Sequence, residues 1–263
     1  MELATVRKRT KKLLHLVAPQ RAPWRDEIDL VIRGKRPWRK LGKRPLFIWL
    51  ISHADTLTDQ EIISAEHVFV ASKTYAKKLH EKGAAVSHLP QCTDADLFRS
   101  DLFEPTLRSE VLFVGNWRAE FQRPVVNLAL AAGCPLSVYG RKWEGKLPDG
   151  VLKGASISND KLGAHYASAS VVLNDHHPDM LRNGFVSNRL YDVLASGTPV
   201  MNEEMAGIPA DLREFVFNYK PDTFPDQIDR ALADHNKDRT AIANYVRAQH
   251  SFENRAQTIR AVL

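Results

Sequence analysis

Short, unbroken apolar runs recur along this chain, and amphipathic segments separate them. The clearest is LFIWLIS at residues 46–52, which follows Pro45. A run of this kind suits a strand of a parallel sheet that is covered on both faces, because such a strand has no side that faces solvent. Shorter runs predict strands at residues 29–33, 67–71, 86–89, 111–114, 135–139, 151–153, 171–173, 198–200 and 215–218. The alternation of strands with helices predicts an α/β fold.

The expected elements form two groups, separated by a stretch without sustained periodicity at residues 90–107. In the first group, helices are expected at residues 2–17 and 58–65, and Ser72 caps a helix that Gly83 ends. The second group has expected helices at residues 124–132, 159–169 and 209–214, and residues 222–263 are helical in two or three pieces. We predict a first domain at residues 1–92, a connector at 93–109, a second domain at 110–249 and a C-terminal helix at 250–263.

The composition is typical of a folded protein from a reducing compartment. The chain has 263 residues, of which 44% are hydrophobic, so it can bury a sizeable core. Cys92 and Cys134 lie far apart in unrelated contexts, which indicates neither a disulfide framework nor a metal cluster. No apolar run is as long as a bilayer span, and the N-terminal segment lacks the apolar core of a signal peptide. We expect a cytoplasmic protein, soluble or peripheral at the inner face of the membrane.

Most of the excess positive charge lies near the N-terminus. Residues 1–45 hold fourteen lysines and arginines and four acids, and the whole chain has a net charge of +6. Such a basic arm is suited to an anionic membrane, a nucleic acid or an acidic glycan, and a solvated basic helix is the plainer alternative. Trp24 and Trp38 are too few to form a platform for stacking bases, so no nucleic-acid partner is expected.

Residues 176–201 (HHPDMLRNGFVSNRLYDVLASGTPVM) have the pattern of a loop, a helix, a tight turn and a buried strand. Gly184 allows close approach of the backbone to a ligand, and Ser187 or Asn188 can cap the helix. Free amides at a helix start bind anions, and Arg189 and Asp192 lie three residues apart on one face. A nucleotide diphosphate fits this pattern, with its phosphates on Arg189 or the amides and its ribose on Asp192. An ordinary surface helix with one salt bridge fits it equally well.

A similar turn follows the expected strand at residues 111–114. Gly115 lets the backbone approach a ligand, and Arg118 and Arg123 are cations placed to meet phosphates at the start of the next helix. The GxGxxG fingerprint of dinucleotide-binding proteins is absent from this turn.

Two residue pairs invite comparison with metal sites. Asp94 and Asp96 form a DxD pair, but they lie in the connector without further acids, so Asp94 is better explained as the cap of a turn. His176 and His177 are adjacent and point in different directions, which favours loop structure over a metal pair. No metal site is therefore expected.

Longer motifs extend these patterns: FVGNWR at residues 113–118, SVYGRKW at 137–143, VLNDHHPDMLRNGFVSNRLYDVLASGTPV at 172–200 and HSFENR at 250–255, with FIWLISHAD at 47–55 and VFVASKTYAKKL at 68–79. In these motifs the chain resembles the nucleotide-sugar-dependent glycosyltransferases of the GT-B fold, in the group 1 branch and most nearly its CgeB-like, spore-maturation-protein-like members. The resemblance implies two Rossmann-like α/β domains, the first of them reduced, and a C-terminal helix that crosses back to the first domain.

The resemblance also implies roles for individual residues. Gly115 and Asn116 would lie under the donor diphosphate, with Arg118 or Arg123 as the phosphate cation. His53 would face the sugar, and Asp192 would bind the ribose where relatives usually have glutamate. The remaining donor-binding residues that it implies are Gly140; Gly154, Ser156 and Ile157, which would line the base; and Gly184, Phe185, Val186, Ser187 and Arg189 around the phosphates.

Two features depart from the family pattern. Many retaining relatives have a glutamate eight residues before the acid that corresponds to Asp192, and Gly184 stands at that place here. The first domain has four expected strands, fewer than is usual, so a transferase with a shortened N-terminal domain is expected.

The leading expectation is a metal-independent glycosyltransferase. It would move a sugar from a UDP- or GDP-type donor to a glycan, lipid-linked or protein acceptor, with retention. Arg118, Arg123, Arg189 and a helix start would stabilise the departing diphosphate in place of a metal. The alternative is a non-catalytic protein that binds a nucleotide sugar or glycan, or docks on a larger assembly. An epimerase on the same fold ranks last, because acids that could deprotonate a sugar carbon are not evident in the loops of the second domain.

Overall fold

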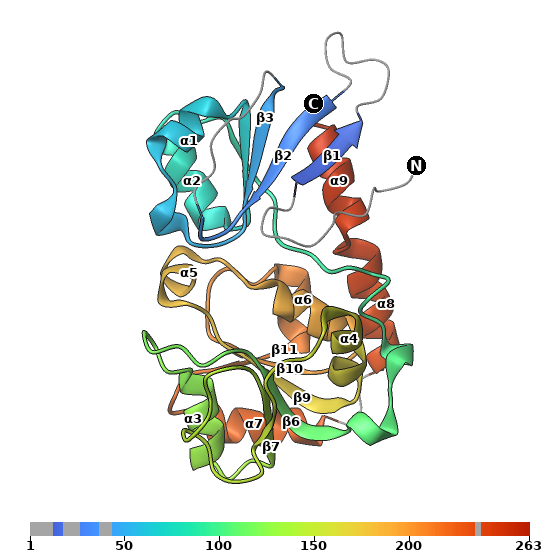
Figure 1. Cartoon of the computed structure of the whole chain (residues 1–263). Coiled ribbons are helices and arrows are strands. Elements are labelled where there is room, and N and C mark those ends of the chain that lie inside the picture. Colours follow the sequence, from blue (N-terminus) through green and yellow to red (C-terminus); the bar gives the residue numbers. More distant parts are fainter. Residues whose placement is uncertain (1–12, 18–26, 37–43, 235–237) are drawn as a thin grey trace. The chain divides into compact units, whose positions relative to one another are not determined.

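The structure is a computed structural model that describes residues 13–17, 27–36, 44–234 and 238–263. The chain divides into two compact units, each built around its own sheet (Figure 1). Unit 1 comprises Met1–Gln91, Pro178–Ser187 and Arg255–Leu263, and unit 2 comprises Cys92–His177 and Asn188–Asn254. Unit 2 begins at Cys92 and includes the expected connector at residues 93–109. Residues 178–187 join unit 1, and the C-terminal segment of unit 1 begins at residue 255 instead of 250.

The sheet of unit 1 has the order β1-β2-β3-β4-β5. Its strands are β1 (Leu13–Val17), β2 (Glu27–Arg33), β3 (Leu46–Leu50), β4 (His67–Val70) and β5 (Val86–His88). Strands β2 to β5 are parallel, and β1 pairs antiparallel with β2. Every residue of β3 is buried, as its unbroken apolar sequence predicts.

The helix expected at residues 2–17 is wrong for residues 13–17, which form β1. Pairing with β2 is the physical reason, because it satisfies backbone groups along the outer edge of β2 that a helix would leave open. Residues 1–12 and most of the basic arm lie outside the described residues.

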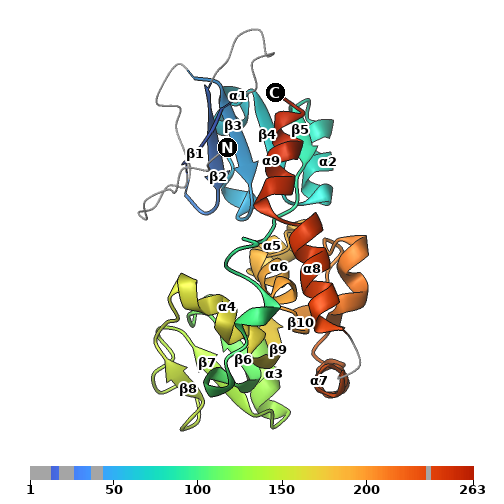
Figure 2. The ribbon, with the colours of Figure 1, turned by 90° about the vertical axis from the view of Figure 1, so that its right-hand side faces the viewer.

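Side-chain caps start α1 and α2 in unit 1, and the cap at Ser72 was predicted. The side chain of Thr58 forms a capping box with Glu61 at α1 (Asp59–Ser64), and Ser72 accepts from the amide of Tyr75 at α2 (Lys73–Glu81). Figures 1 and 2 show α1 and α2 on one side of the sheet and α9 (Phe252–Arg260) on the other. The short 3-10 helix η1 (Ala54–Thr56) follows β3.

Unit 1 also contains a helix that the sequence did not predict, α5 (Pro178–Asn183). Gly184 ends it with φ of 71°, while the amides of Gly184 and Phe185 donate to the carbonyls of Leu181 and Met180. This is the Schellman pattern, in which the residue after the helix must be left-handed. Phe185 is fully buried in the core of unit 1, with its ring centroid 5.7 Å from that of Tyr75.

The sheet of unit 2 is wholly parallel and has the order β11-β10-β9-β6-β7-β8. Its strands are β6 (Ser109–Val114), β7 (Leu136–Tyr139), β8 (Leu152–Gly154), β9 (Ala169–Asn174), β10 (Val200–Glu203) and β11 (Val216–Tyr219). This is a doubly wound sheet, and its strand order reverses between β6 and β9. Ligands of such sheets bind at the carboxyl ends of the strands that flank the reversal.

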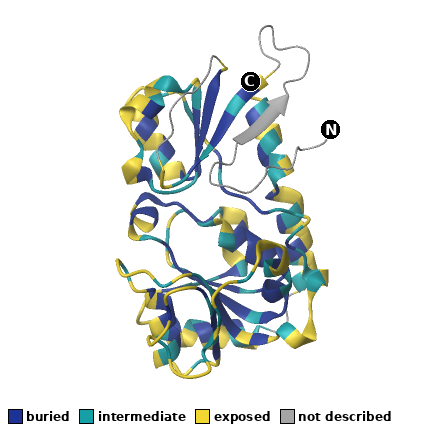
Figure 3. Ribbon diagram, viewed as in Figure 1, coloured by how far each residue is buried: buried dark blue, intermediate teal, exposed yellow. Residues whose placement is uncertain are grey.

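Helices cover both faces of this sheet. The pair α3 (Pro124–Ala131) and α7 (Phe224–Ala233) packs on one face, and α4 (Asn159–Ala167) and α6 (Asn188–Ala195) pack on the other (Figure 1). Helix α8 (Arg239–Gln249) packs against α6. Figure 3 shows the buried strands of each sheet in dark blue beneath helices with exposed outer sides.

The connector and the remaining segments contain short 3-10 helices, η2 (Ser100–Leu102), η3 (Pro105–Leu107) and η4 (Ala210–Phe215). Among the described residues, no helix combines the length and the apolar character that a membrane crossing requires.

Candidate anion site at the carboxyl edge of the second sheet

The two strands that flank the reversal in unit 2 end in polar residues. Strand β6 leads into Gly115 and Asn116, and β9 ends at Asn174 and leads into Asp175. Because β6 and β9 are parallel neighbours, these residues lie at the same edge of the sheet. Helix α6 adds Arg189 to this edge, and the turn before α3 adds Arg123.

Two guanidinium groups share the carboxylate of Asp175. Nη1 of Arg123 donates to Oδ1 of Asp175 at 2.7 Å, and Nη1 of Arg189 lies 3.9 Å from the same oxygen. Arg189 is further fixed by hydrogen bonds to the carbonyl of Val114 at 2.6 Å and to Oδ1 of Asn174 at 3.2 Å. Two guanidinium groups therefore converge on one carboxylate.

Aromatic rings hold these cations in place. The Cζ atoms of Arg123 and Arg189 lie 5.5 and 5.3 Å from the centroid of the Phe113 ring, which is fully buried. Arg123 also lies 4.9 Å from the ring of Phe121. Guanidinium groups on ring faces are attracted electrostatically, so both orientations are fixed before any ligand arrives.

Burial and the neighbouring charges act against each other at Asp175. Burial raises the pKa of its carboxyl, while Arg123 and Arg189 lower that pKa. Its second oxygen, Oδ2, is buried and accepts no hydrogen bond from the described residues. Burial lowers the pKa of Arg123 and the charge of Asp175 raises it. A guanidinium group nevertheless stays protonated in proteins, so the site remains cationic.

Two asparagines on neighbouring strands support the side chain of Arg189. Asn174 on β9 and Asn202 on β10 are register partners, and Nδ2 of Asn174 donates to Oδ1 of Asn202 at 2.7 Å. This bond leaves Oδ1 of Asn174 to accept from Arg189. Both asparagines are fully buried, where an unpaired amide would be costly.

The glycines predicted to bind the donor serve internal packing in unit 2. The amide of Gly115 donates to Tyr139, and the amide of Gly140 donates to Gly154. A Cβ on Gly140 would lie 2.1 Å from the carbonyl oxygen of Gly115, so a side chain has no room there. Their close approach is between strands β6, β7 and β8, and the positions of Gly115 and Gly140 at the donor stay predictions.

Other predicted residues of unit 2 have mixed environments. Oδ1 of Asn116 accepts from the amide of Arg141 at 2.8 Å, and its carbonyl accepts from Nε of Arg123 at 2.9 Å. Arg118 is exposed in the turn before α3. Ser156 is exposed and Ile157 is half-buried between β8 and α4.

Asp192 is buried on α6 and takes partners inside unit 2. Its Oδ1 accepts from the hydroxyl of Thr93 at 2.8 Å, and its Oδ2 accepts from Nδ2 of Asn188 at 2.9 Å. Burial raises the pKa of Asp192 to about 7, although these two hydrogen bonds lower it. Arg189 instead points to β6 and β9, so the two residues do not form the simple surface salt bridge that the sequence allowed.

His53 and residues 184–187 belong to unit 1. His53 follows β3, and its Nδ1 lies 2.9 Å from Oγ of Ser52. Two residues later, Asp55 accepts from Arg182 at 2.7 Å and from Asn183 at 3.1 Å, so the loop after β3 contacts α5. The amides of Gly184 and Phe185 donate to the carbonyls of Leu181 and Met180 in α5, and a contact of this turn with the donor phosphates stays a prediction.

The residue pairs that were compared with metal sites make other contacts in unit 2. Oδ1 of Asp94 accepts from the amides of Asp96 and Leu97, so the DxD pair forms the predicted turn cap. The amide of His176 donates to Glu203, and the ring of His177 packs edge-on against Phe121. Across the described ranges, no three histidine, cysteine or acidic side chains are grouped as metal ligands.

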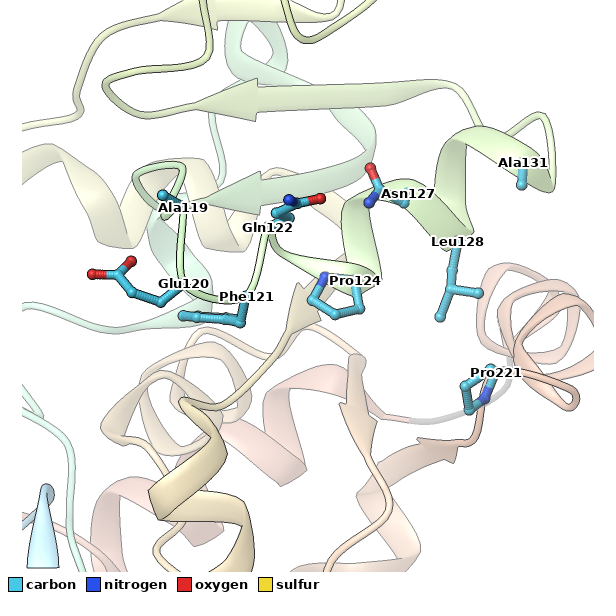
Figure 4. Close-up of a pocket in the computed structure, with 9 residues that line it drawn as sticks. All are labelled: Ala119, Glu120, Phe121, Gln122, Pro124, Asn127, Leu128, Ala131 and Pro221. Atoms are coloured by element: carbon cyan, nitrogen blue, oxygen red, sulfur yellow. The ribbon is translucent and has the colours of Figure 1, made fainter. Parts of the chain in front are cut away.

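An open pocket lies beside α3 in unit 2 (Figure 4). Figure 4 shows Phe121 and Pro124 on one part of its wall and Leu128 and Pro221 on another. Its lining residues are Ala119, Glu120, Phe121, Gln122, Pro124, Asn127, Leu128, Ala131 and Pro221. Glu120 is the one charged residue among them, and a carboxylate repels phosphate, so this pocket is less suited to an anion than the arginine cluster.

Sequence reasoning missed Asp175 and Asn174 as parts of the site. The signal was present, because both residues directly follow a buried apolar run that ends at the reversal of the sheet. Their importance depends on Arg123 and Arg189, which come from elements distant in sequence, so the cluster could not be assembled from local patterns.

A family model described as "Glycosyl transferase-like" matches residues 118–261, more than half of the chain. No curated protein gives a significant match. The likenesses to solved structures are in fold, at low sequence identity.

Three solved structures illustrate the likeness. Sucrose-phosphate synthase from Thermosynechococcus elongatus has a TM-score of 0.57 at 16% identity, with 84% of this chain and 68% of that chain covered. HepE from Anabaena, in complex with UDP-glucose, has a TM-score of 0.60 at 13% identity, with 83% and 72% covered. The UDP-forming α,α-trehalose-phosphate synthase from Burkholderia vietnamiensis has a TM-score of 0.57 at 12% identity, with 84% and 67% covered. With the two sheets described above, these likenesses confirm the predicted GT-B fold.

Proposed function

Because the chain belongs to the glycosyl transferase-like family, we propose that it transfers a sugar from a UDP- or GDP-type nucleotide sugar to an acceptor. The observation that carries the proposal is the pair of guanidinium groups that share Asp175 where the sheet of unit 2 reverses. Doubly wound sheets bind nucleotides at this place. Two cations around one carboxylate leave a positive charge that a diphosphate can neutralise.

Arg189 and Arg118 bind the donor phosphates in this proposal. Arg189 is partly exposed and is held in place by Val114 and Asn174. Arg118 is exposed in the turn between β6 and α3. Arg123 is buried and already paired with Asp175, so its positive charge attracts the donor phosphates without a direct hydrogen bond to them. As the bond to the sugar breaks, negative charge grows on the diphosphate, and preorganised cations stabilise that charge. Fixed arginines thus do the electrostatic work of a metal ion, and the proposed reaction is metal-independent.

Several finer assignments belong to the same proposal. Asp192 as the ribose ligand, Ser156 and Ile157 around the base, and Val186 and Ser187 near the phosphates stay predictions. His53, in unit 1, is assigned to the transferred sugar. Retention of configuration and membership of the CgeB-like branch rest on the resemblance of the motifs. The solved complex of HepE contains UDP-glucose, which makes UDP-glucose the first donor to try.

The acceptor is proposed only by class, as a glycan, a lipid-linked molecule or a protein. The basic arm at residues 1–45 suits contact with the anionic inner face of a membrane, because lysines and arginines are attracted to such a surface. A lipid-linked acceptor would be found at the same surface.

The proposal is tested by incubating the protein with UDP- and GDP-linked sugars and following release of the nucleoside diphosphate. Release, with the sugar recovered on water or on an added acceptor, is the expected result, and the anomeric form of the product reports retention or inversion. Tight binding without release would favour the non-catalytic binding protein. Conversion of the sugar without release would favour an epimerase. A complete lack of binding to either donor at millimolar concentration would overturn the proposal.

A further inference from the structure

A buried ion pair in unit 1 joins β2 to α1. Arg33, the last residue of β2, is 1% exposed, and Glu61 on α1 is 4% exposed. Nε of Arg33 donates to Oε1 of Glu61 at 2.7 Å, and Nη2 donates to Oε2 at 3.1 Å. A two-point contact of this kind fixes the plane of the guanidinium group as well as its position.

Arg33 uses further hydrogen bonds to hold the loop after β3. Nη2 donates to the carbonyl of Thr56 at 2.6 Å, and Nη1 donates to the Thr56 hydroxyl at 3.2 Å and to the carbonyl of Gly34. The Thr56 hydroxyl donates to the carbonyl oxygen of His53 at 2.8 Å, and the Thr56 amide donates to the same oxygen at 3.0 Å. A continuous series of hydrogen bonds therefore leads from Glu61 through Arg33 and Thr56 to the backbone of His53.

His53 has a backbone conformation that needs such support. Its φ is 55° and its ψ is 48°, which is the left-handed region. Residues with a side chain adopt this region rarely, and they persist there where the surrounding structure imposes it. His53 lies three residues after the end of the apolar strand β3, on the side of the first sheet where the strands have their carboxyl ends and where ligands of parallel sheets bind.

Stability alone does not account for this ion pair. Desolvation of two buried charges offsets most of their attraction, and apolar side chains of similar size could fill the same space. What an apolar pair could not do is bind both the carbonyl and the hydroxyl of Thr56. We propose that Arg33, Thr56 and Glu61 are positioning residues that hold the backbone of His53 in its left-handed conformation, and so orient His53 for the role that the proposed function gives it. The catalytic consequence rests on the proposed function, whereas the effect on the conformation of His53 does not.

The sharpest test removes the hydrogen bonds that join the Thr56 hydroxyl to Arg33 and His53 and keeps the ion pair, while the bonds of the Thr56 backbone to the same two residues remain. Arg33→Met would leave Glu61 buried without its partner and could unfold unit 1, so the main variant is Thr56→Val, which lacks the hydroxyl but keeps the shape. Thr56→Ser retains the hydroxyl and is the conservative rescue. Ser64→Ala is the matched control, because it removes a hydroxyl bonded to the carbonyl of Glu61 without touching the loop. Each purified full-length variant is examined by thermal melting, by NMR of the histidine ring protons and by steady-state kinetics with a UDP-sugar. The His53 resonances are assigned with His53→Gln.

We expect Thr56→Val to shift or broaden the His53 ring resonances and to lower kcat by about 10- to 100-fold, with the donor KM changed less than about twofold. Thr56→Ser and Ser64→Ala should match the wild type in all three measurements. An unchanged His53 signal with unchanged kcat in folded Thr56→Val overturns the inference. Equal losses in Thr56→Val and Ser64→Ala overturn it too, since they would mean a general effect of lost hydroxyls. If the wild type transfers no sugar, the proposed function fails, and the NMR comparison still decides whether Thr56 positions His53.

Discussion

The carboxylate of Asp175 accepts a hydrogen bond of 2.7 Å from Nη1 of Arg123, and both side chains are buried at the end of the second sheet. The same carboxylate oxygen lies 3.9 Å from Arg189. Asp175 is thus the counter-charge that lets two arginines stay inside the folded unit before a ligand arrives.

Asp175→Asn should destabilise the protein strongly. The amide keeps the shape but removes the negative charge, which leaves two guanidinium groups without compensation. We expect the free energy of unfolding in urea to fall by about 3–5 kcal/mol. Adding pyrophosphate should recover part of the loss, because it supplies the missing negative charge. A loss below about 0.5 kcal/mol, the range of an ordinary surface change, would contradict the role given to Asp175.

Asp192 should make stability depend on pH. Its pKa is about 7 in the folded protein because it is buried, so the folded state binds this proton more tightly than the unfolded state does. Its stabilising contribution is complete below the unfolded pKa of about 4 and is lost as the pH rises through about 7. Asp192→Asn removes this dependence. As the pH rises from 4 to 8, the free energy of unfolding in urea should fall by about 2–4 kcal/mol more in the wild type than in the variant. A difference that stays constant with pH would show that the pKa is not raised.

Gly184→Ala tests whether Gly184 is a helix cap or a phosphate ligand. Its φ of 71° is strained for alanine, and the new Cβ would lie 3.3 Å from Oγ of Ser72. Gly83→Ala is the matched control, since Gly83 has φ of 84° and open space around it. Each left-handed alanine should cost about 1–2 kcal/mol in urea unfolding, and Gly184→Ala should cost more than Gly83→Ala. Affinity for UDP should stay unchanged in both variants. A tenfold weaker affinity in Gly184→Ala at normal stability would restore the role as a ligand.

Donor binding should not require a divalent cation. The described residues offer no group of three metal ligands, and the arginines supply the positive charge. We expect the affinity for UDP, measured by calorimetry, to agree within about twofold in EDTA and in magnesium, since the phosphates contact cationic side chains directly. Binding that appears only when magnesium is added would contradict this prediction.

Much of the fold was predictable because it depends on local signals. Unbroken apolar runs located the parallel strands, and Ser72 marked a helix start through its own side chain. Two elements were not predictable in this way. The strand β1 forms because β2 has an open edge, and α5 folds because Met180 and Phe185 enter the core of unit 1. Both depend on partners distant in sequence.

In the candidate site, too, local patterns predicted single residues but not their partners from distant parts of the sequence. Arg118, Arg123 and Arg189 were predicted as cations from their place before or at helix starts. The sequence could not show that Arg123 is buried on Asp175, or that Asp192 pairs with Thr93 from the connector. Gly115 was predicted as a point of close approach to a ligand, and the structure shows that its carbonyl is also approached closely by Gly140 of the neighbouring strand.

The most direct measurement compares the binding of UDP, GDP and uridine to the wild type and to Arg189→Met by isothermal titration calorimetry. Arg44→Met is the matched control, because Arg44 forms an exposed ion pair with Glu27 in unit 1. Thermal melting confirms that each variant is folded. If the arginines of unit 2 bind the donor diphosphate, a nucleoside diphosphate should bind the wild type about 10- to 100-fold more tightly than uridine, and Arg189→Met should remove most of this difference. Equal binding of UDP and uridine, or no binding of UDP or GDP at millimolar concentration, would contradict the account.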